Sequence, residues 1–343
     1  MGQRESNLPF PLASLDVIRL NPFGEFLKKL LTKGVKYDII YMSRGQGRQV
    51  PMAERNLKMN NKLDKRRKYY LVLDCETATL PYAHNFEGEQ RKTIAIAKPL
   101  IYDLGWKIID GNGKVYRRKA YLITEIFSVP HIFNTAYYAS KRPIYLEKLK
   151  NKEITLVSWE TATAELVKDM AEVESVGAYN SMFDYKKAIK FTEEYITNLY
   201  SENYYEWEQE QHRRIEWILG NPKAPSERDF NPNIFEFRGK IYPLFDIWGL
   251  SCENLLNNDE FRQYCKDNNH TTASGRYYPT NAEVAYRFIK GQDDFIESHT
   301  AIEDADIECE ILAEVFKKVK PKNMTMGIIY FPFRMLGRAD IEG

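Results

Sequence analysis

The feature that most constrains this fold is an apolar run, Tyr69-Tyr-Leu-Val-Leu-Asp-Cys75, which has the composition of a buried strand and leads into two acidic residues. Side chains alternate across a strand, so Asp74 and Glu76 point to one side and Cys75 to the other. Two carboxylates that leave an apolar strand together are costly unless a positive charge lies between them. A divalent cation that prefers oxygen ligands, Mg²⁺ or Mn²⁺, is the simplest partner, although an isolated Asp-x-Glu is more often a strand end that meets solvent.

The segments after this run predict an α/β fold. Residues 100–109 and 115–123 read as two strands around the turn Asp110-Gly-Asn-Gly113, which favours an antiparallel hairpin. The pattern further predicts a helix from Ser158, a strand over 175–179, a helix over 184–199, a strand over 242–246 and a last helix over 300–318. This order predicts a mixed five-stranded sheet flanked by helices.

The charge is divided unevenly along the chain, which predicts an N-terminal arm beside a larger domain. Residues 1–68 hold 15 Lys and Arg against 6 Asp and Glu, a net charge of +9, so the remainder carries −8 within the total of +1. We expect a weakly ordered or accessory arm over 1–68, a domain over 69–320 with an insertion at about 200–240, and a C-terminal extension over 321–343. The arm is either a solvated basic tail or a nucleic-acid contact.

Composition excludes several classes of protein. With 43% hydrophobic and 28% charged residues, the chain is not intrinsically disordered, and no apolar run approaches the ~18 residues that a membrane span needs. The N-terminus lacks the pattern of a signal peptide, and the four cysteines form no Cys-x-x-Cys pair. We therefore expect a cytoplasmic protein with neither a zinc site nor disulfides.

Two further motifs place polar side chains at the starts of helices. Asn180-Ser-Met-Phe-Asp184 follows the strand over 175–179, and His299-Thr-Ala-Ile-Glu-Asp304 opens the last helix. Taken alone, Asp184 could help to cap its helix and His299 could be a surface residue. His299 and Asp304 lie within about a turn and a half of each other, so both can contribute to one site.

In combination, Asp-x-Glu, Asn-x-x-Phe-Asp and His-x4-Asp resemble the motifs of the DEDDh family of 3′→5′ exonucleases. That family has a ribonuclease H-like fold and includes the polymerase proofreading epsilon subunit and ribonuclease T. The resemblance covers residues 69–318, and the segments 70–77 and 297–305 are similar to members encoded by bacteriophages and prophages. Thr300 occupies the position of the catalytic Tyr in a related subfamily, so the His version fits.

The resemblance implies metal-dependent hydrolysis with two divalent cations, Mg²⁺ or Mn²⁺. Asp74 would bridge both cations. Glu76 and Asp304 would complete the site of the cation on the nucleophile side, and Asp184 would hold the second one, partly through water. His299 would be the general base, because neutral imidazole suits that role near neutral pH.

The resemblance also implies contacts with the 3′ end of a nucleic acid. Backbone amides near Thr77 would face the terminal 3′-hydroxyl, and Leu80 would lie as a wedge beside the terminal base. Asn180 and Phe183 would support the site. Single-stranded DNA is the first choice of substrate and RNA the second, because family members with the same ligands use either.

The pathway implied is replication, repair or proofreading in a bacterial or phage-infected cell. Proofreading would require a polymerase partner, since the remaining residues are too few for a polymerase domain. The rival interpretation is a nucleic-acid-binding or polymerase-associated module with incidental catalysis.

Aromatic residues of the insertion could stack on bases or form a local hydrophobic lid: Tyr204, Tyr205, Trp207, Trp217, Phe230, Phe235 and Phe237.

Overall fold

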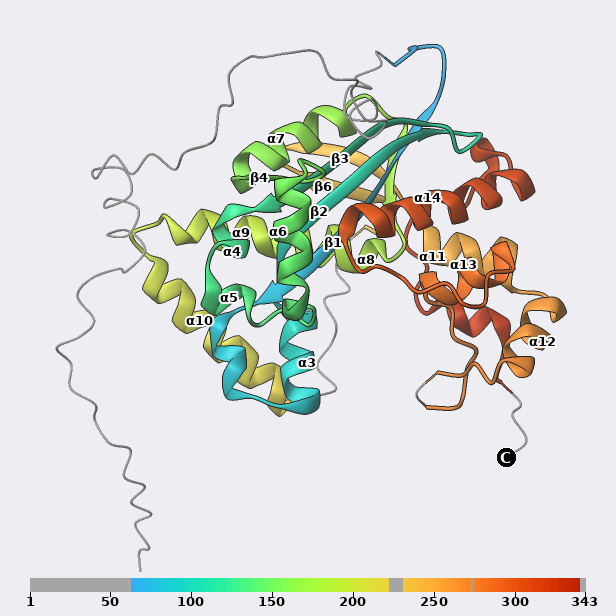
Figure 1. The fold of residues 1–343 in the computed structure, drawn as a ribbon. Helices are drawn as coiled ribbons and strands as arrows, with labels where there is room; N and C mark the ends of the chain where they lie inside the picture. The colour runs from blue at the N-terminus through green and yellow to red at the C-terminus, as the bar shows by residue number, and fades with distance from the viewer. Residues whose placement is uncertain (1–62, 222–230, 273, 340–343) are drawn as a thin grey trace, which may run out of the picture. The chain divides into compact units, whose positions relative to one another are not determined.

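A mixed sheet of seven strands, in the order β4-β3-β2-β1-β5-β7-β6, lies at the centre of the residues that the computed structural model describes, 63–221, 231–272 and 274–339 (Figure 1). The strands are β1 (Tyr69–Thr79), β2 (Pro99–Asp110), β3 (Val115–Ile123), β4 (Thr155–Val157), β5 (Ser175–Ala178), β6 (Ile234–Phe237) and β7 (Lys240–Asp246). β2 is antiparallel to both β1 and β3, whereas β1, β5 and β7 run parallel. The α/β class and the mixed sheet are as predicted.

The predicted number of five strands is wrong, because β4 and β6 add one strand at each edge. These strands have three and four residues, which is too short for an alternating pattern to stand out from a loop. β6 comes from the region that was predicted to be an insertion, and it pairs antiparallel with β7. Residues 1–62 of the predicted arm lie outside the described residues.

Helices surround the sheet. The longer ones are α3 (Gly88–Ala97), α6 (Arg142–Lys150), α7 (Trp159–Met170), α9 (Lys190–Leu199), α10 (Tyr204–Gly220), α12 (Asp259–Asp267), α13 (Ala282–Lys290) and α14 (Ala301–Lys318). The short ones are η1 (Pro81–Asn85), α4 (Thr124–Phe127), α5 (Pro130–Phe133), η2 (Ala139–Lys141), α8 (Ser181–Phe183), η3 (Asp184–Ile189), α11 (Ile247–Ser251), η4 (Cys252–Leu256), η5 (Pro321–Asn323) and η6 (Pro332–Leu336). In the described part of the chain, no helix combines the length and the apolar character needed to cross a membrane.

Adjacent residues of β2 show which helices cover which face of the sheet. A Cβ on Gly105 would lie 2.5 Å from the backbone nitrogen of Ile302, so this position faces the start of α14. The next side chain, Trp106, points the opposite way and donates a hydrogen bond from Nε1 to Asp169 of α7 at 2.9 Å. α14 therefore packs on one face of the sheet and α7 on the other.

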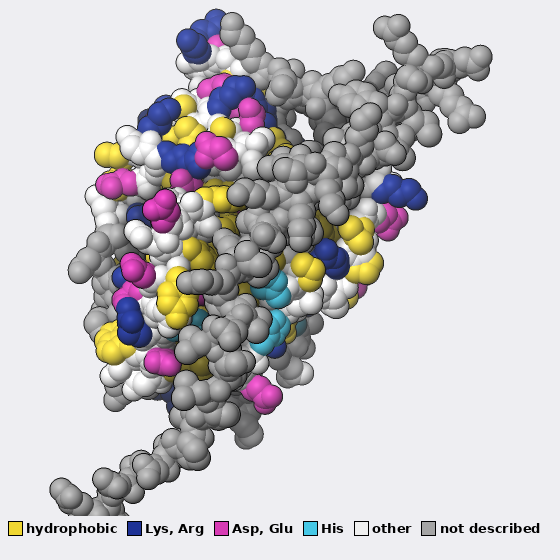
Figure 2. Space-filling view, turned by 90° about the vertical axis from the view of Figure 1, so that its left-hand side faces the viewer, with side chains coloured by type: hydrophobic (Ala, Val, Ile, Leu, Met, Phe, Trp, Pro, Cys, Tyr) yellow, Lys and Arg dark blue, Asp and Glu magenta, His cyan; other side chains and the backbone are white. Residues whose placement is uncertain are grey.

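The charges on one side of the molecule are mixed. Figure 2 shows the side that lies at the left of Figure 1, and its visible coloured surface intersperses Lys and Arg with Asp and Glu and with hydrophobic side chains. Where the grey atoms leave the described residues in view, this side presents no continuous basic face.

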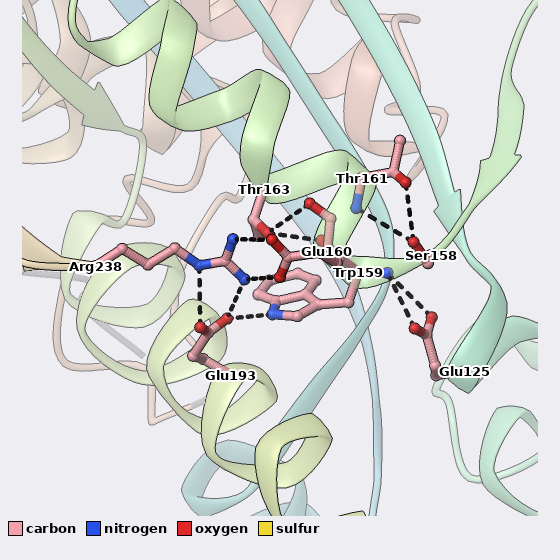
Figure 3. Close-up of polar contacts among 8 residues, drawn as sticks. All are labelled: Glu125, Ser158, Trp159, Glu160, Thr161, Thr163, Glu193 and Arg238. Carbon is pink, nitrogen blue, oxygen red and sulfur yellow. Dashed lines mark hydrogen bonds and ion pairs between the residues drawn. The ribbon is translucent and has the colours of Figure 1, made fainter. Parts of the chain in front are cut away.

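A polar network fixes the edge of the sheet to the helices on the α7 face (Figure 3). Arg238, in the turn between β6 and β7, donates to Glu160 of α7 at 2.8 and 3.0 Å and to Glu193 of α9 at 3.0 and 3.1 Å. The buried Trp159 indole also donates to Glu193. Both oxygens of Glu125 accept the first amide of α7, at 3.1 and 3.2 Å, so this carboxylate satisfies a helix N-terminus from another element. The network holds α7, α9 and the hairpin together.

Candidate metal centre

The acidic end of β1 faces the start of α14. In the antiparallel register, Asp74 lies opposite Gly105 and Glu76 lies opposite Asp103. Side chains of directly opposed residues share a face of the sheet, and the Gly105 position faces α14. Asp74 and Glu76 are thus directed toward α14, and Cys75 is directed to the other face, as the alternation predicts.

Two residues of β2 bring the first turn of α14 onto these carboxylates. Gly105 leaves room for the helix backbone, because any Cβ there would overlap the Ile302 amide. Asp103, which is fully buried, accepts a hydrogen bond from the Ala301 amide at 2.9 Å and so satisfies one of the free donors at the helix start. Asp304 lies in this first turn, over the end of β1.

The structure brings the five predicted residues into one region. Ligand atoms of Glu76, His299 and Asp304 all lie within 4.8 Å of one another, a spacing that could hold a metal ion. Asp74 and Asp184 lie beside this group without belonging to it. Burial raises the pKa of Asp74 well above its usual value, and the charge of Asp184 raises it further.

The carboxyl groups of Asp74, Glu76, Asp184 and Asp304 all have raised pKa values, chiefly because burial disfavours their charge, and for Asp74, Glu76 and Asp304 the charges of neighbouring carboxylates add to this effect. Burial is the largest cause for Glu76, followed by the charge of Asp304. Burial and the nearby Glu297 raise the pKa of Asp304 to about 8. Burial raises the pKa of Asp184 to about 7. A divalent cation would relieve this repulsion, which is the physical signature expected of a cation site.

Asp184 approaches the cluster from the side of Cys75. The Cys75 thiol donates a hydrogen bond to Asp184 Oδ1 at 3.1 Å, and Asp184 is only 4% exposed. Asp184 does not cap its helix, because Asn180 caps α8 by accepting the Phe183 amide at 3.3 Å. This contact places Asn180 at the start of the helical segment that contains Asp184.

The imidazole of His299 is restrained on several sides. Its ring stacks on Tyr138, with centroids 4.3 Å apart and an interplanar angle of 14°. Its Nδ1 lies 3.7 Å from a carboxylate oxygen of Glu297, and Lys141 donates to the neighbouring Ser298 carbonyl at 2.6 Å. Burial and the charge of Lys141 lower the pKa of His299, which favours the neutral ring at neutral pH.

Several residues of the centre were not predicted from the sequence. Glu308 lies one turn after Asp304 on α14, is 3% exposed, and its Oε2 has no hydrogen-bond partner among the described residues. Its charge is the largest effect after burial in raising the pKa of Asp74. The sequence feature that could have indicated Glu308 is its position four residues after Asp304 on the same helix. Asp103 and Tyr138 come from distant segments, and no local pattern indicates them.

Of the two residues predicted to contact the 3′ end, Thr77 and Leu80, only Thr77 is accessible to solvent. Thr77 is partly exposed at the end of β1, next to a register shift between Glu76 and Thr77. Leu80 is 2% exposed, so its side chain packs inside the protein and does not form the predicted wedge beside a terminal base. Leu80 follows the end of β1 and the register shift, so the alternation that orients Asp74 and Glu76 does not predict where the Leu80 side chain points. Phe183 is half-buried beside Asp184.

The aromatic residues of the insertion mostly pack locally. Trp207 stacks on Phe191 at 6.1 Å and contacts Tyr195 at 5.9 Å, and Phe235 and Phe237 are buried in the edge of the sheet. Tyr204 lies 6.0 Å from Trp207, whereas Tyr205 and Trp217 are exposed. Phe230 lies outside the described residues.

Comparison of the chain with models of protein families, with curated proteins and with solved structures finds no match.

Proposed function

We propose that this chain is a 3′→5′ exonuclease of the DEDDh type, with a ribonuclease H-like fold, which hydrolyses the 3′-terminal nucleotide of DNA in the presence of Mg²⁺ or Mn²⁺. The observation that carries the proposal is the convergence of five residues from three separate motifs at the end of β1. Glu76, His299 and Asp304 have ligand atoms within 4.8 Å of one another, although 223 positions separate Glu76 from His299. A solvated strand end would not require these residues to meet.

The donor set fits hard divalent cations. Carboxylate oxygens dominate it, and the neighbouring Cys75 stays a neutral thiol because burial raises its pKa well above its usual value. Asp74, Glu76 and Asp304 would hold one cation, and Asp74 with Asp184 the other. Two such cations supply charge stabilisation for the attacking and leaving oxygens of a phosphodiester.

The residues of this chain would then position and deprotonate the nucleophile. Neutral His299 would accept a proton from the attacking water while Tyr138 and Glu297 restrain the ring. Asp103 and Gly105 would hold Asp304 in place through the start of α14. Attack at phosphorus breaks the bond to the 3′-oxygen of the penultimate nucleotide, which leaves a free 3′-hydroxyl and releases a 5′-monophosphate.

The test is digestion of 5′-labelled single-stranded DNA and RNA of the same sequence. In Mg²⁺ the DNA should shorten from its 3′ end one nucleotide at a time, and a chelator should stop the reaction. Full activity in excess chelator, or internal cleavage alone, would contradict the proposal. Faster digestion of the RNA would support the proposed reaction and identify RNA, not DNA, as the substrate. A polymerase partner and a replication or repair role remain part of the proposal for DNA.

A further inference from the structure

A cavity of about 630 Å³ has five aromatic side chains in its described lining, together with small polar and apolar residues. We call it the aromatic pocket and define it by Tyr179, Asn180, Trp248, Tyr277, Thr280 and Phe333. The mechanism above assigns no role to this pocket.

The aromatic pocket and the metal centre lie on the same edge of the sheet. β1, β5 and β7 are parallel neighbours, so their carboxyl ends meet at one edge. β1 carries Glu76 near this end, Tyr179 directly follows β5, and Trp248 follows β7. Since adjacent strands are about 4.8 Å apart, the pocket begins within roughly 10 Å of the centre, which is about the span of three nucleotides at ~3.4 Å each along one stacked strand.

Two segments connect the pocket to the centre directly. Asn180 lines the pocket and lies four residues before Asp184. Asn281 also lines the pocket and lies two residues before Glu283, whose carboxylate is within 4.8 Å of the ligand atoms of Glu297 and His299. Both asparagines are exposed, so their amides offer donors and acceptors at the rim.

The walls of the pocket are fixed by hydrogen bonds and ring contacts. The Trp248 indole donates to Thr280 Oγ1 at 2.8 Å, and the Tyr179 hydroxyl donates to the Thr280 carbonyl at 2.6 Å. Phe333 lies 6.1 Å from Trp248, with an interplanar angle of 22°, and 4.9 Å from Tyr277. With the polar groups of Trp248 and Tyr179 engaged, what the pocket offers a ligand is ring faces and apolar edges.

The segments that form the pocket also carry two arginines. Arg276 precedes Tyr277 and Arg334 follows Phe333, and both are exposed. Within the described ranges, neither guanidinium forms an ion pair with a carboxylate. Ring faces with arginines on the same segments are the combination that binds single-stranded nucleic acid, where bases stack and phosphates meet positive charge.

We propose that the aromatic pocket binds one unpaired nucleobase of the substrate strand, within the last few nucleotides of the 3′ end. This inference deepens the proposed exonuclease function and rests on it for the identity of the strand. A paired base cannot enter the pocket, so occupation of the pocket selects single-stranded or frayed 3′ ends.

The test measures binding without hydrolysis. The full chain is titrated into a 5′-fluorescein-labelled oligo(dT) in Ca²⁺, and fluorescence anisotropy gives the dissociation constant. Phe333→Ala should weaken binding about tenfold, and Phe333→Leu, which keeps an apolar side chain and loses the ring, should weaken it by a similar factor. Tyr200→Ala removes an aromatic side chain that is 61% exposed on another part of the protein and should leave affinity unchanged.

A second oligonucleotide makes the result specific to the base. Abasic sites at the last three positions should weaken binding to the wild-type chain and have little further effect on Phe333→Leu, because both changes remove the same stacking contact. Equal affinity of the wild-type chain and Phe333→Leu for the intact oligonucleotide would overturn the proposal and leave the pocket as a surface for another kind of partner.

The two proposals fail in different ways. If the pocket variants hydrolyse DNA normally in Mg²⁺ and bind it with wild-type affinity, the role of the pocket is contradicted and the exonuclease proposal stands. If DNA binding depends on the Phe333 ring but the chain does not hydrolyse DNA, the role of the pocket stands and the exonuclease proposal is contradicted.

Discussion

His299 adopts a backbone conformation that few residues other than glycine adopt, with φ at +51°. Such a conformation costs of order 1 kcal/mol, so the surroundings must hold it in place. The stacked Tyr138 ring, the nearby Glu297 carboxylate and the hydrogen bond from Lys141 to Ser298 provide that restraint. Four other described residues that are not glycine share this conformation, Lys152, Arg238, Asn269 and Phe331, so the strain alone does not mark a catalytic residue, and it is the fixed orientation of the His299 ring that suits the proposed general base.

Replacing this side chain should separate chemistry from binding. His299→Ala should lower the rate by roughly 10²–10⁴, the usual contribution of a general base, and leave oligonucleotide affinity nearly unchanged. The wild-type pKa is lowered, so the imidazole gains its proton, and the rate falls, only below about pH 6.5. A pH–rate profile at saturating Mg²⁺ should lose this acidic limb in the variant.

His212→Ala is the matched control. His212 of α10 packs on Tyr82 of η1, with ring centroids 3.9 Å apart, and has no role in the mechanism. An acidic limb that persists in His299→Ala would place the general base elsewhere.

At the scale of elements, the contact between β2 and the start of α14 determines where Asp304 lies. Gly105 is the point of closest approach, and a Cβ there would lie 2.5 Å from the Ile302 nitrogen and 2.7 Å from the Ala301 carbonyl carbon. Both are backbone atoms, so no side-chain rotation can relieve the overlap. A methyl group at position 105 must displace the first turn of α14.

Gly105→Ala should therefore reduce both stability and hydrolysis. We expect a fall of several degrees in the unfolding temperature, and a rate loss larger than the stability change explains, because Asp304 and His299 move with the helix. Gly220→Ala is the matched control, since a Cβ at that position meets no atom within 4 Å. Wild-type activity in Gly105→Ala would show that the position of α14 does not set the geometry of the centre.

The longer elements were predictable from local pattern, and the contacts between them were not. The helix from Ser158 is confirmed as α7, with the Ser158 hydroxyl accepting the Thr161 amide, and the last helix is confirmed as α14. The helix predicted over 184–199 begins as a π-helix over Asp184–Ile189, a distinction that apolar spacing does not encode. Gly105 and Asp103 act through partners about 200 positions away, so no local pattern marks them.

At the scale of the whole molecule, the buried acidic cluster makes stability depend on pH, and the proposed metal binding would change that dependence. Asp184 and Asp304 have raised pKa values of about 7 and about 8, so the folded protein binds protons more tightly than the unfolded chain. Their stabilising effect is fully present below about pH 4 and is lost as the pH rises through 7 and 8. A cation bound as proposed would replace those protons at high pH.

Metal-free protein in chelator should accordingly have a lower unfolding temperature at pH 8.5 than at pH 6. Mg²⁺ should raise it at both values, and by more at pH 8.5. Glu308→Gln, which removes one of the repelling carboxylates and keeps the shape, should flatten the pH dependence in chelator. Differential scanning calorimetry measures all three, and a metal-free protein that becomes more stable from pH 6 to pH 8.5 would contradict this account of the cluster.

The uneven charge of the chain predicts a role for its first segment in binding long substrates. Residues 1–68 carry a net +9 and the remainder −8, and the visible side of the body in Figure 2 mixes both signs. Removing residues 1–58 should weaken binding of long DNA and make its dependence on salt shallower, because fewer counterions are released. Hydrolysis of a very short oligonucleotide should change little. An unchanged salt slope for long DNA would instead indicate that this segment binds a protein partner or is structural.

The central claim is that the carboxylates at the end of β1 carry metal-dependent removal of the 3′-terminal nucleotide. The most direct test is single-turnover release of a 3′-terminal 5′-monophosphate from single-stranded DNA in Mg²⁺. Wild-type chain and Asp259→Asn, which alters a fully exposed carboxylate on α12, should release it at the same rate. Asp74→Asn should release almost none while unfolding at a temperature no lower than the wild type. Near wild-type release by Asp74→Asn would contradict the account.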